Sequence, residues 1–135
     1  MSYASKKGYR GEEDAAEFFN KLVGPQFHVC RIGGIEKRKT VYAGDVSLVG
    51  YCKRHNFRAT ADERDCYLSP YFIEAKNQAN PRIWQDLVKA ESDARVAQKA
   101  GVILYAIKTE KNQNGERIVV MRPEILARLL QCHLP

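Results

Sequence analysis

Several absences narrow the class of protein. No apolar run reaches the roughly 18 residues of a membrane-spanning helix, so we expect no contact with a membrane. The first residues, MSYASKKGYRGEED, lack the apolar segment of a secretory signal peptide, which predicts a cytoplasmic protein. Neither an internal repeat nor a low-complexity tract occurs. The four cysteines have no regular spacing, which argues against a disulfide scaffold and predicts reduced thiols: Cys30, Cys52, Cys66 and Cys132.

One arrangement of these cysteines resembles a metal site. Cys52, His55 and Cys66 form a C-x2-H pattern followed by a third ligand after ten residues, and Cys30 or Asp65 could complete a tetrahedral zinc site. A second closely spaced cysteine pair, common in zinc sites, is missing. The spacing therefore leaves open whether these residues bind zinc.

Length and charge describe a basic single domain. The 135 residues are 44% hydrophobic and 28% charged, which fits one globular domain over residues 1–135. Lys and Arg number 22 against 16 Asp and Glu, giving a net charge of +6 and a pI near 9.2, which favours a polyanionic partner. The positive residues gather in SKKGYR and RIGGIEKRKT, typical of flexible basic arms, although such runs are often only solvated loops.

Hydrophobic periodicity predicts alternating helices and strands. We expect helices over 9–23, 80–101 and 123–134, and strands over 27–32, 41–51, 71–78, 102–108 and 117–121. Residues 51–70 read as a polar excursion between two core strands, and residues 111–116 as a hairpin turn. Asn80 as N-cap and Pro81 at the first helical position predict where the second helix begins, and Gly101 where it ends. This order predicts an α/β fold with a mixed central β-sheet flanked by helices.

An acidic residue lies on the apolar side of the first helix. Glu12 precedes Ala16 by four residues and Phe19 by seven, so its carboxylate falls on the buried arc, whereas Glu13 lies at the margin of that arc. A carboxylate aimed at the interior needs a cation, a donor or a metal. The alternative is a position in a frayed first turn, where the helix dipole favours acids.

Two strands carry charges in unexpected places. Asp45 interrupts a good strand, which indicates either a functional site or a bulge at the neighbouring Gly44. In YFIEAKNQ, residues 71–78, alternation places Glu74 and Lys76 on one face. An ordinary same-face ion pair is the alternative.

Together these residues fit phosphodiester hydrolysis. Clustered carboxylates that hold Mg²⁺ lower the pKa of a bound water and neutralise charge on the phosphate, and a nearby lysine stabilises the transition state. This requires that Asp45 and Glu74 lie on adjacent strands.

The pattern resembles the PD-(D/E)xK nuclease superfamily, whose signature of an Asp followed by acidic-x-Lys matches GD at 44–45 and EAK at 74–76. The opening KGYRGEEDAAEFF, followed by FHVCRIGG, AGDVSLVG and YFIEAKNQ, is similar to archaeal-type Holliday-junction resolvases. The resemblance covers most of the chain outside residues 51–70. Gly44 stands where the signature has Pro, and the excursion at 51–70 is longer than in the family.

The resemblance implies a restriction-endonuclease-like core and a role for each matched residue. Asp45, Glu74 and the carbonyl of Ala75 would bind Mg²⁺, for which Mn²⁺ would substitute. Lys76 would be catalytic, and Glu12 would join the metal site. Arg31 falls where the family has a DNA-contacting arginine. From the basic segments we expect further DNA contacts from Lys7, Arg10, Lys37, Arg38 and Lys39.

The sequence therefore predicts a Mg²⁺-dependent, structure-selective DNA endonuclease, foremost a Holliday-junction resolvase. Two symmetric incisions in a four-way junction need two active sites, so we expect a homodimer. A related nuclease acting on flaps, single strands or duplex is the alternative within enzymes. A non-catalytic nucleic-acid-binding module, in which the carboxylates only pair with arginines, is the alternative outside them.

Overall fold

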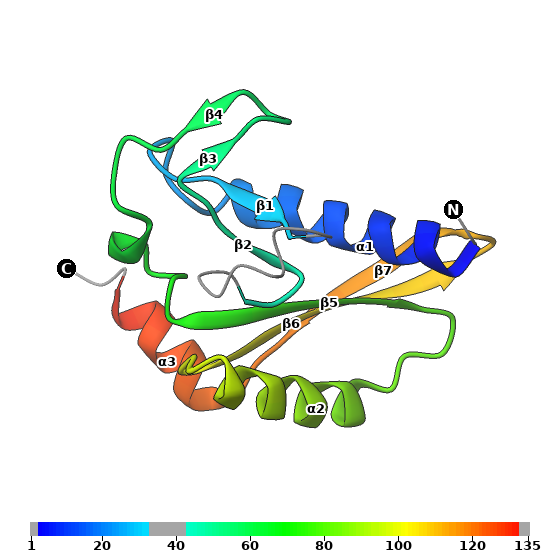
Figure 1. Cartoon of the computed structure of the whole chain (residues 1–135). Helices are drawn as coiled ribbons and strands as arrows, with labels where there is room; N and C mark the ends of the chain where they lie inside the picture. The colour runs from blue at the N-terminus through cyan, green and yellow to red at the C-terminus, as the bar shows by residue number, and fades with distance from the viewer. Residues whose placement is uncertain (1–2, 33–42, 133–135) are drawn as a thin grey trace.

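A five-stranded mixed sheet forms the centre of the protein (Figure 1). The computed structural model describes residues 3–32 and 43–132. The strand order is β1-β2-β5-β6-β7, with β5 and β6 parallel and the other neighbours antiparallel. The strands are β1 (Val29–Arg31), β2 (Val46–Leu48), β5 (Tyr71–Gln78), β6 (Gly101–Glu110) and β7 (Gln113–Val120). The predicted α/β class with a mixed sheet is confirmed.

Helices cover both faces of this sheet. The helices are α1 (Tyr3–Asn20), α2 (Ile83–Val96) and α3 (Pro123–Gln131). On one face, Phe19 of α1 packs with Ile73 and Ile103 in the larger core cluster, and on the other, Leu87 of α2 packs with Phe72 in a second cluster. β6 contributes alternate residues to both clusters, so it is buried on both faces as its apolar run predicts. None of the helices within the described residues has the length and apolarity needed to cross a membrane.

The excursion after β2 contains structure that the sequence did not predict. β3 (Tyr51–Cys52) and β4 (Phe57–Arg58) form a separate two-stranded sheet, followed by a 3-10 turn at Glu63–Asp65. This β3–β4 hairpin lies above β1 and β2 in Figure 1. It buries little apolar surface of its own, which explains why its sequence is polar and lacks a clear period.

The predicted bounds of the second helix were wrong. α2 begins at Ile83 with Arg82 at its N-cap, and no side chain caps it. β5 continues to Gln78. The residues that follow turn the chain toward the face of the sheet that α2 covers, and Asn80 and Pro81 belong to that turn. α2 ends at Val96, and the positive φ of 59° at Gln98 terminates it in the manner usually left to glycine.

The β6–β7 hairpin lies where predicted, but its turn is tighter. Lys111 and Asn112 both have positive φ angles, of 48° and 62°, as in the two-residue turns that match the twist of a hairpin. The Asn114–Gly115 pair, a common turn signal, lies within β7 instead. A Cβ at Gly115 would lie 2.4 Å from the backbone oxygen of Lys108, so close pairing with β6 explains that glycine.

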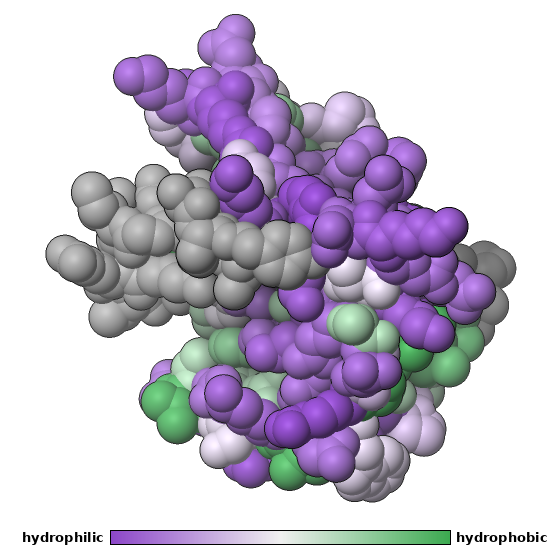
Figure 2. Space-filling model, turned by 90° about the vertical axis from the view of Figure 1, so that its right-hand side faces the viewer, coloured by the Kyte–Doolittle hydropathy of each residue, from purple (hydrophilic) through white to green (hydrophobic). Residues whose placement is uncertain are grey.

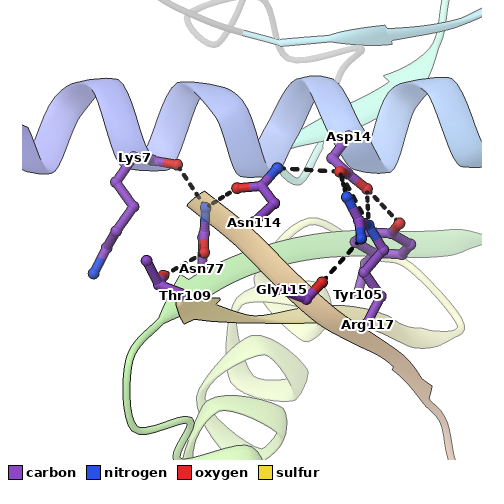
Figure 3. Close-up of polar contacts among 8 residues, drawn as sticks. All are labelled: Lys7, Asp14, Asn77, Tyr105, Thr109, Asn114, Gly115 and Arg117. Atoms are coloured by element: carbon purple, nitrogen blue, oxygen red, sulfur yellow. Dashed lines mark hydrogen bonds and ion pairs between the residues drawn. The ribbon is translucent and has the colours of Figure 1, made fainter. Parts of the chain in front are cut away.

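A polar network joins α1 to β6 and β7 (Figure 3). Asp14 accepts hydrogen bonds from Tyr105 Oη (2.5 Å), Arg117 Nε (2.8 Å) and Asn114 Nδ2 (3.1 Å). Burial alone would raise the pKa of Asp14, but the hydrogen bonds from Arg117, Tyr105 and Asn114 outweigh burial and lower it. The network therefore holds an ionised carboxylate between the helix and the sheet.

Asn77 of β5 extends this network toward the start of α1. Its Nδ2 donates to Asn114 Oδ1 (2.7 Å) and to the backbone oxygen of Lys7 (3.2 Å), and its Oδ1 accepts from Thr109 Oγ1 (2.5 Å). A Cβ at Gly11 would lie 3.0 Å from Asn77 Cβ, so α1 crosses β5 closely at this point. The helix and strand that carry Glu12 and Glu74 are thus fixed relative to each other.

Candidate active site and metal-binding residues

Asp45 lies beside the segment of β5 that carries Glu74 and Lys76. β2 and β5 are adjacent, with Val46 opposite Ile73, and Asp45 immediately precedes β2 rather than lying within it. The Asp45 backbone N–H donates to Ile73 O (2.9 Å), and its carboxylate Oδ2 accepts from the backbone N–H of Ala75 (3.0 Å). Ala75 stands between Glu74 and Lys76, so the Asp45 carboxylate is held at the predicted signature.

Gly44 makes this approach possible. Its φ is +86°, and a Cβ there would lie 2.5 Å from Ile73 O and 3.1 Å from Ile73 N. A proline, whose φ is near −65°, does not fit this conformation. The strand expected over residues 41–51 was wrong at this point: β2 begins at Val46, and Gly44 and Asp45 lie in a bend just before it.

Glu74 and Lys76 share one face of β5. Their neighbours Ile73 and Ala75 pack with the larger core cluster against α1, so alternation places the two charged side chains on the opposite face. Lys76 Nζ lies 3.7 Å from Glu74 Oε1, and the side chains are 30% and 15% exposed. The pair is therefore half-buried.

Glu12 lies in the middle of α1, because the helix begins at Tyr3. The frayed first turn is thus excluded as an explanation of its position. The Glu12 side chain is 15% exposed, and its carboxylate accepts from Arg31 Nε at 2.6 Å. Arg31 also lies over the ring of Tyr9, 4.5 Å from its centroid. Arg31 is thus a cationic partner of the kind that a carboxylate on the buried side of the helix needs.

Glu13 has a different environment from Glu12. Its two carboxylate oxygens accept from Arg54 Nη1 (2.6 Å) and Nη2 (2.7 Å), a bidentate pair between α1 and the β3–β4 hairpin. Arg54 belongs to the polar excursion and was not predicted to contact the helix. The pair is exposed, and we expect it to contribute little to stability.

The three predicted carboxylates do not converge as tightly as the ligands of one ion. Among the residues that the structure describes, Glu12, Asp45 and Glu74 do not form a group whose ligand atoms all lie within 4.8 Å of one another. Asp45 and Glu74 share the β2–β5 pair, whereas Glu12 is tied to β1 through Arg31. The geometry favours two carboxylates at the site, with Glu12 supporting them from α1.

The predicted DNA-binding residues fall into three groups. Arg10 Nη1 donates to Asn112 O (2.7 Å) at the β6–β7 turn, and Arg31 binds Glu12. Lys7 lies in the first half of α1, where its backbone oxygen accepts from Asn77. Residues 37–39, which include Lys37, Arg38 and Lys39, lie outside the described residues.

The β3–β4 hairpin adds basic residues that the sequence did not single out. Lys53, Arg54 and Arg58 are exposed there. Hydrophilic side chains cover the upper part of the face in Figure 2, at the height of this hairpin and α1, while hydrophobic ones gather lower down. The only signal in the sequence was the polar character of the excursion.

Within the described chain, the side chains that gather as metal ligands do are histidines and cysteines. Ligand atoms of His28, Cys30, Cys52 and His55 all lie within 4.8 Å of one another. The zinc hypothesis drawn from the sequence named Cys52, His55 and Cys30, which the structure brings together, and zinc binding itself stays a prediction. The hypothesis was wrong for Cys66, which packs in the larger core cluster, and it missed His28. The H-x-C spacing of His28 and Cys30 on a strand was the signal that could have identified them.

Comparison with protein-family models, with curated proteins and with solved structures finds no significant match.

Proposed function

We propose that this protein is a Mg²⁺-dependent DNA endonuclease with a restriction-endonuclease-like core that cleaves four-way junctions. The observation that carries the proposal is the hydrogen bond from the Ala75 N–H to Asp45 Oδ2. It aligns the aspartate just before β2 with the Glu-x-Lys of β5, the pairing of acids and lysine that the signature describes. The +86° φ at Gly44 indicates that the backbone is adapted to bring Asp45 there.

The donor set fits magnesium. The carboxylates of Asp45 and Glu74 and the carbonyl of Ala75 would hold the ion, because Mg²⁺ and Mn²⁺ prefer hard oxygen ligands. The Asp45 carboxylate is oriented by the Ala75 N–H, and the Glu74 side chain is only 15% exposed, so both are restrained before any ion binds. When bound, the ion would supply an activated water and neutralise charge on the phosphate.

Lys76 would act on the reacting phosphate. Its ammonium lies on the same strand face as Glu74, 3.7 Å away, and is 30% exposed, so it can approach a substrate at this face. A positive charge held there stabilises the negative charge that develops on the phosphoryl oxygens, and its N–H groups can orient the attacking water.

Glu12 is a positioning residue in this proposal. Its bond to Arg31 links α1 to β1, and Arg31 stands opposite Val46, the residue after Asp45. Holding β1 and β2 against the helix restrains the start of β2, from which Asp45 extends. The basic side chains of α1 and of the β3–β4 hairpin would contact DNA phosphates. A homodimer would present two such sites to a junction.

A non-catalytic nucleic-acid-binding module is the second candidate. The ion pairs Glu12–Arg31, Glu13–Arg54 and Glu74–Lys76 favour it, because they give each of these carboxylates a cationic partner without any metal. The two candidates differ in one result: only the nuclease breaks phosphodiester bonds.

The test is cleavage of labelled four-way, flap, single-stranded and linear duplex DNA, each with Mg²⁺ and with a chelator. We expect Mg²⁺-dependent incision of the four-way junction, abolished in Asp45→Asn and Glu74→Gln, with DNA binding retained. Lys76→Ala should lose most activity and keep its Mg²⁺ affinity, measured by calorimetry. Asp93→Asn, which changes an exposed acid on α2, is the matched control and should cleave normally.

Each outcome bears on the proposal. Binding without cleavage of any substrate would favour the non-catalytic module. Cleavage of flaps or duplex alone would retain the nuclease and refute the junction preference. Normal turnover in purified Asp45→Asn would refute the assigned site.

A further inference from the structure

Four side chains from two distant segments meet between β1 and the β3–β4 hairpin. Cys30 Sγ lies 3.3 Å from Cys52 Sγ, Cys52 Sγ lies 3.3 Å from His55 Nδ1, and His28 Nε2 lies 3.0 Å from His55 Nδ1. All four ligand atoms lie within 4.8 Å of one another. Cysteine and histidine are separated by one residue in the first segment and by two in the second.

The local backbone explains why each pair converges. His28 and Cys30 are two residues apart along the extended chain at β1, so their side chains point to the same face. Cys52 ends β3, and a tight turn follows in which the Asn56 N–H donates to Lys53 O (3.1 Å) and Asn56 has a φ of 50°. The turn folds His55 back toward Cys52.

The three distances between ligand atoms are close to, but slightly shorter than, the edges of a zinc-centred tetrahedron. Zinc–sulfur bonds of about 2.3 Å and zinc–nitrogen bonds of about 2.0–2.1 Å require roughly 3.8 Å between two sulfurs, 3.5 Å between sulfur and nitrogen, and 3.3 Å between two nitrogens. The observed values of 3.3, 3.3 and 3.0 Å are each shorter by a few tenths of an ångström. Outward movements of that size, within the range of side-chain torsions, would open the centre for an ion.

We propose that His28 Nε2, Cys30 Sγ, Cys52 Sγ and His55 Nδ1 bind one Zn²⁺ ion. Two thiolates and two imidazoles in a tetrahedral arrangement suit Zn²⁺, whereas Mg²⁺ prefers oxygen. Four protein ligands fill the coordination sphere, so the site is structural and has no position for a reacting water. Binding converts both thiols to thiolates and releases their two protons to solvent.

The β3–β4 hairpin is too small to be stable unless it is attached to the rest of the domain. β3 and β4 contain two residues each, and a two-stranded ribbon of this size is not stable alone. The apolar cluster beneath it is small, with Ile32, Val49 and Cys52 buried. A zinc ion would fasten the hairpin to β1 and would also position Arg54, which lies between Cys52 and His55 and binds Glu13 of α1. The inference does not depend on the proposed nuclease activity.

A disulfide between Cys30 and Cys52 is the competing interpretation, because the two sulfur atoms are already in contact. A disulfide removes both thiolate ligands, so it and the zinc site exclude each other. The two states are distinguished by metal content and by thiol reactivity.

The test uses the full chain, purified with a thiol reductant and without chelator. Elemental analysis should find about one zinc per chain, and replacement with Co²⁺ should give the visible absorption of tetrahedral cobalt with a thiolate charge-transfer band. Cys30→Ser and Cys52→Ser should lose the metal. Cys132→Ser, which changes an exposed cysteine outside the cluster, is the matched control and should keep it.

A second measurement on the wild type covers the case in which the cysteine variants do not fold. Removal of zinc with a strong chelator should lower the melting temperature and expose Cys30 and Cys52 to alkylation, mapped by mass spectrometry, and added Zn²⁺ should reverse both effects. Cys132 should react in both states. A zinc-free wild type whose stability and alkylation do not respond to Zn²⁺, or a Cys30–Cys52 disulfide in protein purified under reducing conditions, would overturn the inference.

Discussion

Replacing Gly44 tests the backbone arrangement on which the candidate active site depends. At a φ of +86°, an L-residue costs about 1–2 kcal/mol relative to glycine. The new Cβ would also lie 2.5 Å from Ile73 O and 3.1 Å from Ile73 N, both backbone atoms of the central strand β5, which cannot shift as a flexible side chain would. Overpacking of this kind adds about 1–3 kcal/mol. We therefore expect Gly44→Ala to lower the free energy of unfolding by roughly 2–5 kcal/mol.

That loss is a large fraction of the stability of a small domain, which is typically about 5–15 kcal/mol. For a chain of this size it corresponds to a fall in melting temperature of roughly 6–20 °C. Gly44→Pro, which would restore the residue of the nuclease signature, should be more severe, because proline holds φ near −65°.

The assay is urea and thermal unfolding followed by circular dichroism. Gly8→Ala is the control, because Gly8 lies exposed in α1 and a Cβ there would meet nothing within 4 Å. Alanine favours the helix, so that variant should gain about 0.5–1 kcal/mol. A Gly44→Ala protein within about 0.5 kcal/mol of wild type, the range of neutral surface changes, would show that the approach of Gly44 to Ile73 does not constrain residue 44.

Three further predictions follow from the charged residues. Glu12→Gln should slow Mg²⁺-dependent junction cleavage by about 10–100-fold, as loss of a supporting interaction does, while Glu13→Gln should leave it near normal; equal initial rates in the two purified variants would contradict the positioning role. Alanines at residues 37–39 should flatten the slope of log K for DNA against log salt by about 0.9 for each phosphate that the segment no longer neutralises, whereas an unchanged slope would identify that segment as a solvated loop. Because the pKa of Asp14 is lowered in the folded state, its stabilisation is present above the unfolded pKa of about 3.9 and is lost as pH falls through the folded value. Asp14→Asn should therefore lower stability at neutral pH by about 1–3 kcal/mol and reduce the loss on acidification, and parallel stability–pH curves for the two proteins would count against the network.

Local patterns predicted the elements that bury a regular face. The strand expected over residues 71–78 has those bounds in the structure, because its alternation and its apolar residues are properties of the strand itself. The apolar arc of α1 placed Glu12 on the covered side of the helix, where its carboxylate is 15% exposed. The strand expected over residues 41–51 is shorter in the structure, where β2 covers Val46–Leu48 and lies antiparallel beside β5, with Asp45 just before it.

Local signals failed where the rest of the fold competes with them. Asn80 and Pro81 favour the start of a helix, but the chain needs these residues to pass from one face of the sheet to the other. Asn114–Gly115 favours a turn, but pairing with β6 keeps it in a strand and moves the turn to Lys111–Asn112. Propensities of a few tenths to one kcal/mol cannot outweigh the pairing of a whole strand.

Which charged and sulfur-bearing side chains meet depends on contacts between segments that are far apart in the sequence. Arg31 reaches Glu12 across 19 residues of sequence, Asp14 binds Arg117 across 103, and Cys30 meets Cys52 across 22. The class of fold, the basic charge and the acid and lysine residues proposed for the active site could be predicted before the structure, because composition and periodicity are local properties. The order of the strands and the position of the β3–β4 hairpin beside β1 determined which side chains pair with each other. Hydrogen bonding and metal coordination require atoms to lie within a few ångströms, and the spacing of two residues along the chain does not predict whether their side chains come that close.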